Sequence, residues 1–260
     1  MLIKGSITAL ATPMKEDSSI DYESLKNLIN FQIDNGIDGI VAVGTTGESA
    51  TIDFEDHIKL IEFFVKESDN RVPIIAGTGA NSTEEAIILT KAAKTIGADA
   101  ALLVSPYYNK PPQEGLLQHH LKIAEEVQIP QILYNVPSRT ASFIESSTVS
   151  KLAKHENIIG IKDATGEMKN LEDLKSLCNK EIDAEEFFLF SGDDFTFLEF
   201  LQLGGHGTIS VTSNVVPSTI SKICDLAKTN LLEAQTLESS LSELNELLFS
   251  ESNPIPVKWA

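Results

Sequence analysis

Short apolar runs alternate with longer amphipathic segments along nearly the whole chain. Eight of these runs are rich in β-branched residues and end in glycine, proline or polar residues, a pattern typical of buried strands. They are ITALATP (7–13), GIVAVGTTG (39–47), PIIAGTG (73–79), AALLVSPYY (100–108), QILYNVP (131–137), IIGIKDAT (158–165), FFLFSGDD (187–194) and GTISVTS (207–213). We therefore predict eight strands.

The segments between these runs carry the periodicity of helices. Apolar residues recur three and four positions apart, as at Leu25, Leu28, Ile29 and Ile33. Ser82 followed by Glu85 has the spacing of an N-terminal capping box, and Gly97 lies where that helix should end. These segments are therefore predicted to be helices that separate the strands.

This alternation predicts the fold class. Strands that alternate with helices form right-handed βαβ units around a parallel sheet. Eight units between residues 7 and 213 match an α/β fold, the closed (β/α)8 or TIM barrel. A doubly wound open sheet is the alternative, but GTTG (44–47) and GTG (77–79) lack the G-x-G-x-x-G spacing of a dinucleotide site. We predict a catalytic barrel over residues 1–215 and a C-terminal helical segment over residues 216–260 that packs on it.

Composition narrows the classes of partner. The chain has 260 residues, of which 42% are hydrophobic, enough for a large core in one barrel or in two ordinary domains. Its 20 basic and 38 acidic residues give a formal charge of −18, which repels nucleic-acid phosphates and anionic membrane surfaces. Cys178 and Cys224 have no C-x-x-C spacing, and neither a secretory signal nor an apolar run of roughly 20 residues is recognised. We expect a cytoplasmic protein with no nucleic-acid or membrane partner.

Polar residues gather at the predicted strand ends, where the loops of such a barrel converge over its active site. They are Thr12, Thr45, Thr46, Glu48, Tyr107, Tyr108, Tyr134, Asn135, Arg139, Lys162, Asp163, Asp193 and Ser210. The five histidines are scattered over other segments without metal-ligand spacing, so we predict no metal site.

Lys162 ends the apolar run that begins at Ile158, and a lysine in that position has two interpretations. Its stem can be covered while the ammonium reaches water or a salt bridge, which local evidence favours. Alternatively, the amine is held in a dry pocket, where a neutral fraction can attack a carbonyl and form a Schiff base. The neighbouring residues must decide between them.

Three nearby features support catalysis only in combination. Tyr134 ends the preceding strand, about 5 Å from Lys162 across the sheet, and can shuttle protons or pack as an ordinary half-buried ring. Arg139 can grip a carboxylate or form a loop salt bridge. The turn GTTGES (44–49) can cradle an anion with backbone N–H groups and hydroxyls, or contain glycine and threonine for shape alone.

The chain resembles the dihydrodipicolinate synthase family over essentially all its 260 residues. The resemblance is carried, in order, by GTTGES, AGTGAN, PYYNKPPQEG, YNVPSRT, IIGIKDATG, SGDD, GGHGTISVTSNVVP and NPIPVKW. GTTGE is shared by the wider pyruvate-dependent aldolase superfamily, including N-acetylneuraminate lyase. The combination with YNVPSRT and NPIPVKW is more specific.

The resemblance implies a Schiff-base lyase of lysine and diaminopimelate biosynthesis that uses no cofactor or metal. Lys162 would condense with pyruvate, and the resulting enamine would attack L-aspartate 4-semialdehyde to give 4-hydroxy-tetrahydrodipicolinate. By the same matching, Tyr134 is the general acid and base. Thr45 and Tyr108 would continue a proton relay to solvent.

Substrate-binding residues follow from the same resemblance. Thr46 and Ile209 would hold pyruvate, with Gly192 helping through its backbone. Arg139 would hold the carboxylate of the semialdehyde. The choice of these residues comes from the family motifs and not from spacing alone.

The resemblance also implies assembly and regulation. Family members pair into dimers, commonly a dimer of dimers, in which one tyrosine of the 107–108 pair crosses into the partner's site; here Tyr108 would act in trans. Lysine-inhibited relatives bind L-lysine at the dimer interface, at positions matching Ser49, Ala50, His57, Asn81, Glu85 and Tyr107. Phe54 stands where lysine-sensitive relatives often carry histidine, which leaves inhibition open.

Two further features depart from the family pattern. Relatives commonly continue beyond NPIPVKW with more helix, so a shortened C-terminal appendage and uncovered apolar surface near Trp259 are expected. An insertion at residues 178–186 falls in a polar connection before the seventh strand and should be harmless.

Three alternative functions remain open. One is a related aldolase acting on a sugar acid, as N-acetylneuraminate lyase does. The others are a barrel that binds a keto acid without catalysis and a structural oligomer. We predict the Schiff-base lyase, because the separate local features coincide in one chain.

Overall fold

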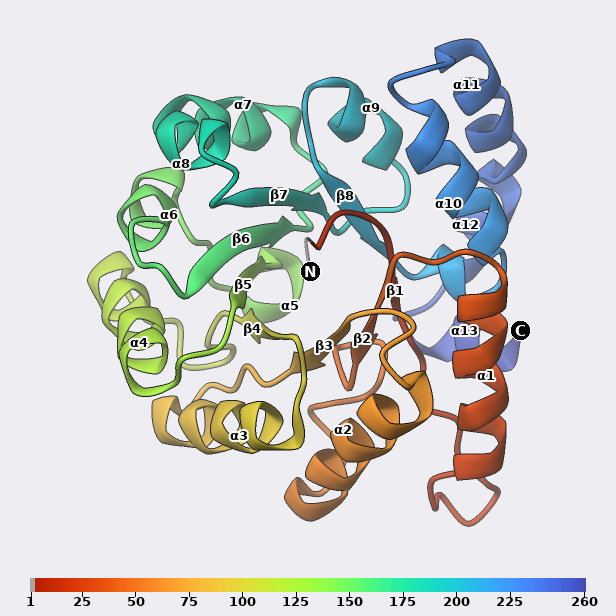
Figure 1. Ribbon diagram of the computed structural model, residues 1–260, viewed down its shortest axis with the longest axis horizontal. Helices are drawn as coiled ribbons and strands as arrows, with labels where there is room; N and C mark the ends of the chain where they lie inside the picture. The colour runs from red at the N-terminus through yellow and green to blue at the C-terminus, as the bar shows by residue number, and fades with distance from the viewer. Residues whose placement is uncertain (1–2) are drawn as a thin grey trace.

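Eight parallel strands close into a barrel in the computed structural model, which describes residues 3–260 (Figure 1). β1 pairs with β2 on one side and with β8 on the other, which closes the sheet. The predicted TIM barrel is therefore confirmed and the open-sheet alternative is wrong. The strands are β1 (Gly5–Ala9), β2 (Gly39–Ala42), β3 (Ile74–Gly77), β4 (Ala100–Val104), β5 (Gln131–Asn135), β6 (Ile158–Asp163), β7 (Phe188–Ser191) and β8 (Gly207–Ser210).

Helices surround the barrel and separate its strands (Figure 1). Ser82 caps the helix predicted after the third strand, since its side chain accepts a hydrogen bond from the Glu85 N–H, and Gly97 ends that helix with φ of 98°. The helices are α1 (Tyr22–Asp34), α2 (Phe54–Ser68), α3 (Thr83–Ile96), α4 (Gln113–Glu126), α5 (Pro137–Thr140), α6 (Ser146–Leu152), α7 (Met168–Leu177), α8 (Asn179–Asp183), α9 (Phe197–Gln202), α10 (Pro217–Leu226), α11 (Leu231–Ser240), α12 (Ser242–Leu248) and α13 (Ile255–Trp259).

The predicted apolar runs are longer than the strands at their carboxyl ends. The second run, for example, extends to residue 47, but β2 ends at Ala42. The residues beyond each strand leave the sheet as turns, because only a few residues per strand can pair in a closed, tilted barrel. These turns carry most of the polar residues singled out above.

The core has two layers, one inside the barrel and one between strands and helices. Inside, Ile7, Ile75, Ile132, Phe190 and Ile209 form one buried cluster that also includes Tyr134. Outside, the alternate strand residues pack against the helices. Since successive side chains of a strand point to opposite faces, Ile161 faces the helix layer and Lys162 faces the barrel interior.

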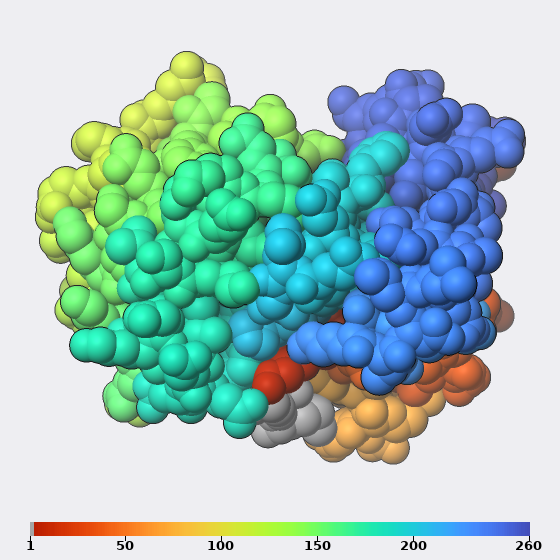
Figure 2. Space-filling model, turned by 90° about the horizontal axis from the view of Figure 1, so that it is seen from above, coloured from red at the N-terminus to blue at the C-terminus, as the bar shows by residue number. Residues whose placement is uncertain are grey.

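The C-terminal helices lie together on one side of the barrel, the side of α1 (Figures 1 and 2). α10 packs against β1, and α11 packs against α10. Trp259 is 91% exposed, and Leu247 and Ile255 are exposed nearby, in agreement with the apolar surface expected there. The insertion at residues 178–186 contains the short helix α8, none of whose residues is buried. No helix among the described residues has the length and apolar character to cross a membrane.

Candidate active site

Lys162 is buried in the barrel and faces Tyr134. The two residues are direct partners in the β5–β6 register, and Lys162 Nζ lies 4.4 Å from the centroid of the Tyr134 ring. Lys162 is only 5% exposed, and no carboxylate within residues 3–260 forms an ion pair with it. This geometry disagrees with the snorkelling and salt-bridge interpretation, which local sequence evidence had favoured. It leaves an amine available for chemistry.

Gly192 makes room for the lysine stem. A Cβ atom at this position would lie 2.6 Å from Lys162 Cε and 2.8 Å from Ala164 Cβ, well inside van der Waals contact. The Gly192 N–H donates to the Asp163 carbonyl at 2.7 Å, which fixes the close approach. The glycine predicted as a substrate contact therefore also has a packing role, because any side chain would displace Lys162.

The GTTGES turn brings two hydroxyls to the barrel mouth. Thr45 is half-buried, whereas Thr46 is 2% exposed and its Oγ1 accepts a hydrogen bond from Asn253 Nδ2 at 3.0 Å. The N–H groups of Glu48 and Ser49 are bonded within the turn, to the carbonyls of Thr45 and Gly44. These two N–H groups are therefore already bonded and do not serve the anion-cradle interpretation, which the sequence left open, and α2 begins only at Phe54.

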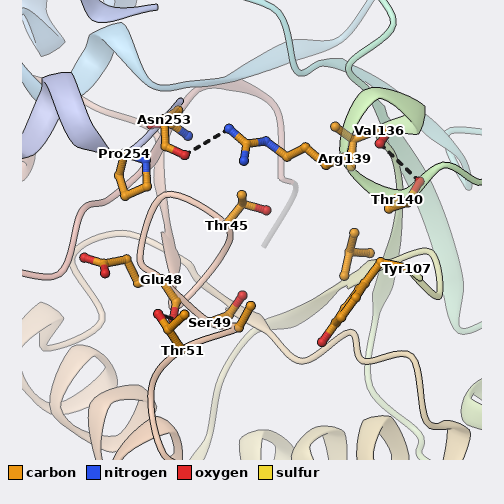
Figure 3. A pocket seen from close by; sticks show the side chains of 12 residues that line it. Thr45, Glu48, Ser49, Thr51, Tyr107, Val136, Arg139, Thr140, Asn253 and Pro254 are labelled. Atoms are coloured by element: carbon orange, nitrogen blue, oxygen red, sulfur yellow. Dashed lines mark hydrogen bonds between the residues drawn. The ribbon is translucent and has the colours of Figure 1, made fainter. Parts of the chain in front are cut away.

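A cavity of about 340 Å³ opens above this turn (Figure 3). In Figure 3, Thr45, Tyr107 and Arg139 approach it from different sides. A small inner space of about 10 Å³, lined by Thr45 and Tyr134, adjoins the cavity and shares Thr45, Ser49 and Val104 with it. Lys162 lines neither space, but Tyr134, whose ring its Nζ faces, lines the inner one. The cavity is lined by Thr45, Glu48, Ser49, Ala50, Thr51, Val104, Tyr107, Val136, Arg139, Thr140, Asn253 and Pro254.

Arg139 supplies a positive charge to this cavity. It lies on α5, a single turn that follows β5 directly, and its Nη2 donates to the Asn253 carbonyl at 2.9 Å (Figure 3). No Asp or Glu in residues 3–260 forms an ion pair with it, in disagreement with the loop salt-bridge alternative. Its remaining donors can therefore meet the carboxylate of a ligand.

The two consecutive tyrosines have different environments. Tyr107 lines the cavity, and burial, assisted by the Glu85 carboxylate, raises the pKa of its phenol. Tyr108 is 89% exposed and has φ of 74°, the left-handed region that a bulky residue rarely adopts. It lines neither space at the mouth of its own barrel. The structure thus brings Lys162, Tyr134 and Thr45 to one mouth, but not Tyr108.

The remaining predicted residues divide into a buried group and a rim. Ile209 is fully buried in the barrel interior. Ser49 and Ala50 line the cavity, Glu85 is exposed on α3, and the Asn81 carbonyl accepts from Asn109. His57 lies underneath, where its Nε2 meets the Gly77 carbonyl at 2.7 Å and burial lowers its pKa.

Two residues of the site were not among the predicted site residues. Asp194 is fully buried and accepts hydrogen bonds from the N–H groups of Val211 and Thr212, at 2.8 and 3.2 Å, which holds the turn after β8. Burial raises the pKa of this carboxyl. Asn253 reaches the site from the C-terminal segment. The SGDD strand end predicted Asp193 rather than Asp194, but the Asp193 side chain accepts from Thr196. Asn253 begins the motif NPIPVKW, which indicates the family but not the contacts of this residue.

Comparisons with known proteins agree along the whole chain. Residues 2–260 match the model of the dihydrodipicolinate synthetase family. A 4-hydroxy-tetrahydrodipicolinate synthase of Teredinibacter turnerae is 53% identical over 260 residues, covering 100% of this chain and 88% of the relative.

Solved structures give the same result. The chloride-inhibited dihydrodipicolinate synthase of Acinetobacter baumannii, complexed with pyruvate, superposes with a TM-score of 0.95 at 50% identity, over 99% of this chain and 87% of that one. The enzyme of Cyanidioschyzon merolae with lysine bound gives 0.93 at 37% identity, over 98% and 86%. Fold and sequence therefore point to the same family.

Proposed function

Because the chain belongs to the dihydrodipicolinate synthetase family, we infer that pyruvate and L-aspartate 4-semialdehyde react at its barrel mouth. The activity is that of a 4-hydroxy-tetrahydrodipicolinate synthase, a lyase of lysine and diaminopimelate biosynthesis. The observation that carries the local assignment is the buried Lys162 amine facing the Tyr134 ring. A sugar-acid aldolase, a keto-acid binder and a structural oligomer are less well supported, since the relatives named above are synthases.

Lys162 is proposed as the nucleophile. Its neutral amine adds to the ketone carbon of pyruvate, and loss of water together with uptake of one proton gives a protonated imine. This imine withdraws electrons, so a methyl proton is lost and a neutral enamine forms. The enamine carbon bonds to the aldehyde carbon of the semialdehyde, whose oxygen takes up a proton and becomes the hydroxyl group, and the protonated imine is formed again. The amino group of the semialdehyde then attacks the imine carbon, which closes the ring and releases Lys162.

Proton transfers are assigned to the groups nearest the amine. Tyr134 lies beside Lys162 Nζ and is proposed as the general acid and base. Thr45 shares the inner space with Tyr134 and would pass the proton outward. Tyr108 is proposed to complete the relay in the site of a second copy, because it is exposed and absent from the cavity of its own chain.

Substrate recognition is assigned to the rim and floor of the cavity. Thr46, Ile209 and the Gly192 backbone are proposed to hold pyruvate. Arg139, whose guanidinium has no carboxylate partner among the described residues, is proposed to hold the carboxylate of the semialdehyde. Loss of the methyl proton and formation of the carbon–carbon bond require neither a metal nor an organic cofactor, because the covalent imine itself is the electron sink.

Assembly, regulation and location follow as further proposals. We expect a homodimer or a dimer of dimers, since Tyr108 needs a second copy to reach a site. L-lysine inhibition is proposed at Ser49, Ala50, His57, Asn81, Glu85 and Tyr107. Three of these residues, Ser49, Ala50 and Tyr107, line the cavity, which supports the proposal. Phe54 argues against it, because lysine-sensitive relatives often carry histidine at that position. The two free cysteines suit a reducing cytoplasm.

Incubating the purified chain with both substrates and detecting the cyclic product tests the function. Formation of that heterocycle supports the synthase, whereas pyruvate release from sialic or keto-deoxy acids, without heterocycle formation, would support the sugar-acid aldolase. A folded chain that binds pyruvate but forms no product would support the binder.

A further inference from the structure

Asn253 connects the C-terminal segment to two residues of the barrel mouth. It follows α12 in the chain, is 8% exposed and lines the cavity. Its side-chain Nδ2 donates to Thr46 Oγ1 at 3.0 Å, across 207 residues of sequence. Its backbone carbonyl accepts from Arg139 Nη2 at 2.9 Å (Figure 3). One residue thus contacts the groups proposed to bind each of the two substrates.

The direction of the amide–hydroxyl bond fixes what the hydroxyl can do. When Asn253 Nδ2 donates, Thr46 Oγ1 is the acceptor and its own hydrogen remains free for another partner. Within residues 3–260 no hydrogen-bond donor reaches the buried Asn253 Oδ1 atom. The bond to Thr46 is therefore the one that holds the side-chain amide, and in this orientation the Thr46 hydrogen is left for another acceptor.

We propose that Asn253 is a positioning residue that holds the Thr46 hydroxyl as a hydrogen-bond donor to the carboxylate of pyruvate. A carboxylate accepts hydrogen bonds only, so a Thr46 hydrogen committed elsewhere would present oxygen lone pairs to the anion and repel it. The backbone carbonyl of Asn253 orients Arg139 independently of its side chain. This inference rests on the proposed function, since it takes pyruvate as the ligand of Thr46.

A second contact distinguishes positioning from simple attachment. Lys258 of α13 forms an ion pair with Glu48 of the GTTGES turn, so the C-terminal segment is fastened to that turn at two points. If Asn253 only fastened the segment, losing the Lys258 contact should have a similar effect on activity. If Asn253 sets the direction of the Thr46 hydroxyl, only changes at Asn253 should alter pyruvate affinity.

The test compares Asn253→Asp and Asn253→Ala in the full chain. Aspartate keeps the shape but can only accept, so it turns the Thr46 hydrogen away from pyruvate, and the KM for pyruvate should rise about tenfold or more with a smaller change in kcat. Alanine frees the hydroxyl to rotate, so the KM should rise only a few-fold. The KM for the semialdehyde should change least, because the carbonyl bonded to Arg139 remains.

Combining Asn253→Asp with Thr46→Val separates the effect of the Thr46 hydroxyl direction from the effect of the negative charge that aspartate introduces. In that background the hydroxyl is absent, so Asn253→Asp should add little to the KM for pyruvate; a full additional increase would mean that charge repulsion acts alone and would overturn the proposal. Asn157→Asp, whose amide contacts the Ala124 carbonyl before β6, is the matched control and should leave both KM values unchanged. Lys258→Met should also leave the KM for pyruvate unchanged.

The outcomes distinguish this proposal from the function on which it rests. An unaltered chain that makes product, together with Asn253 variants whose KM for pyruvate is unchanged, would overturn the positioning role alone. A Lys258→Met variant that raises the KM as much as Asn253→Asp would reduce Asn253 to an attachment point. An unaltered chain that neither makes product nor forms a pyruvate adduct would overturn the function and this assignment together.

Discussion

Lys162 and the pair His119–His120 are both buried titratable groups, but they lie in different layers of the barrel. Lys162 faces inward at a strand end beside Tyr134. The histidines lie on α4, with ring centroids 4.9 Å apart in an edge-to-face arrangement, and both ring nitrogens of His120 lack a hydrogen-bond partner among the described residues. Burial lowers the pKa of both histidines, that of His119 to about 4.

The difference shows that burial without a partner does not by itself identify a catalytic residue. Lys162 itself lines no cavity, but Tyr134, whose ring its Nζ faces, lines the inner space together with Thr45. His119 and His120 line none of the described cavities, and their only side-chain hydrogen bond within residues 3–260 joins His119 Nδ1 to Thr83 Oγ1 at 2.9 Å. We interpret the pair as packing that costs stability in acid.

Lys162→Ala should have the largest effect. Without the amine no imine can form, so kcat should fall by about a thousandfold or more, while the unfolding transition should change little because one stem at the barrel mouth is lost. Steady-state kinetics and thermal unfolding measure both quantities. Lys169→Ala, at an exposed lysine paired with Asp173, is the matched control and should keep full activity.

His119→Gln should alter stability and leave catalysis intact. The pKa of His119 is about 4 in the folded chain and about 6.5 when unfolded, so the unfolded state binds more protons between these values and stability falls as the pH drops through that window. The loss amounts to about 3 kcal/mol for this residue. Urea unfolding at pH 7 and pH 4 should show a smaller acid loss in the variant, with unchanged kcat at pH 7. An equal acid loss in both chains would refute this assignment.

Tyr134→Phe should separate packing from proton transfer within the site. The ring remains under Lys162 Nζ, but the hydroxyl is gone, so kcat should fall by about a hundredfold or more while the fold is kept. Stopped-flow or steady-state assays measure the loss. Unchanged turnover would remove Tyr134 from the proton transfers and leave it with a packing role like that of the histidines.

Arg139→Lys should have the smallest effect of the four. Lysine keeps the charge but loses the planar fork, so the KM for the semialdehyde should rise about tenfold while that for pyruvate stays nearly constant. Varying each substrate at saturation of the other measures the two values. Equal increases for both substrates would mean that Arg139 supports the whole mouth rather than one carboxylate.

The barrel was predictable because each of its strands is a short β-branched run followed by a helical period. Lys162 and Tyr134 could be found because strand ends of a barrel meet at one face, whatever the details of the loops. Asp194 and Asn253 belong to SGDD and NPIPVKW, two motifs of the family resemblance, but periodicity and spacing do not predict what these residues contact. The Asn253–Thr46 bond spans 207 residues of sequence, so no local pattern encodes it.

The strand ends themselves were predicted less well than the strands. The predicted runs continue past β2 and β4, because Val43, Ser105 and Pro106 stay buried although they have left the sheet, Val43 in the cluster between strands and helices. The structure also disagrees with the interpretation that local evidence favoured for Lys162, in which its ammonium reaches water or a salt bridge. Only the packing of β5, β6 and Gly192 around the stem shows that the amine is not held at the surface.

Borohydride reduction in the presence of pyruvate is the decisive experiment for a Schiff base at Lys162. We expect an irreversible adduct, with the mass of pyruvate less water plus two hydrogens, on Lys162 and on no other lysine, and no adduct in Lys162→Ala. A folded chain that stays unmodified, or that is modified on a different lysine, would contradict it.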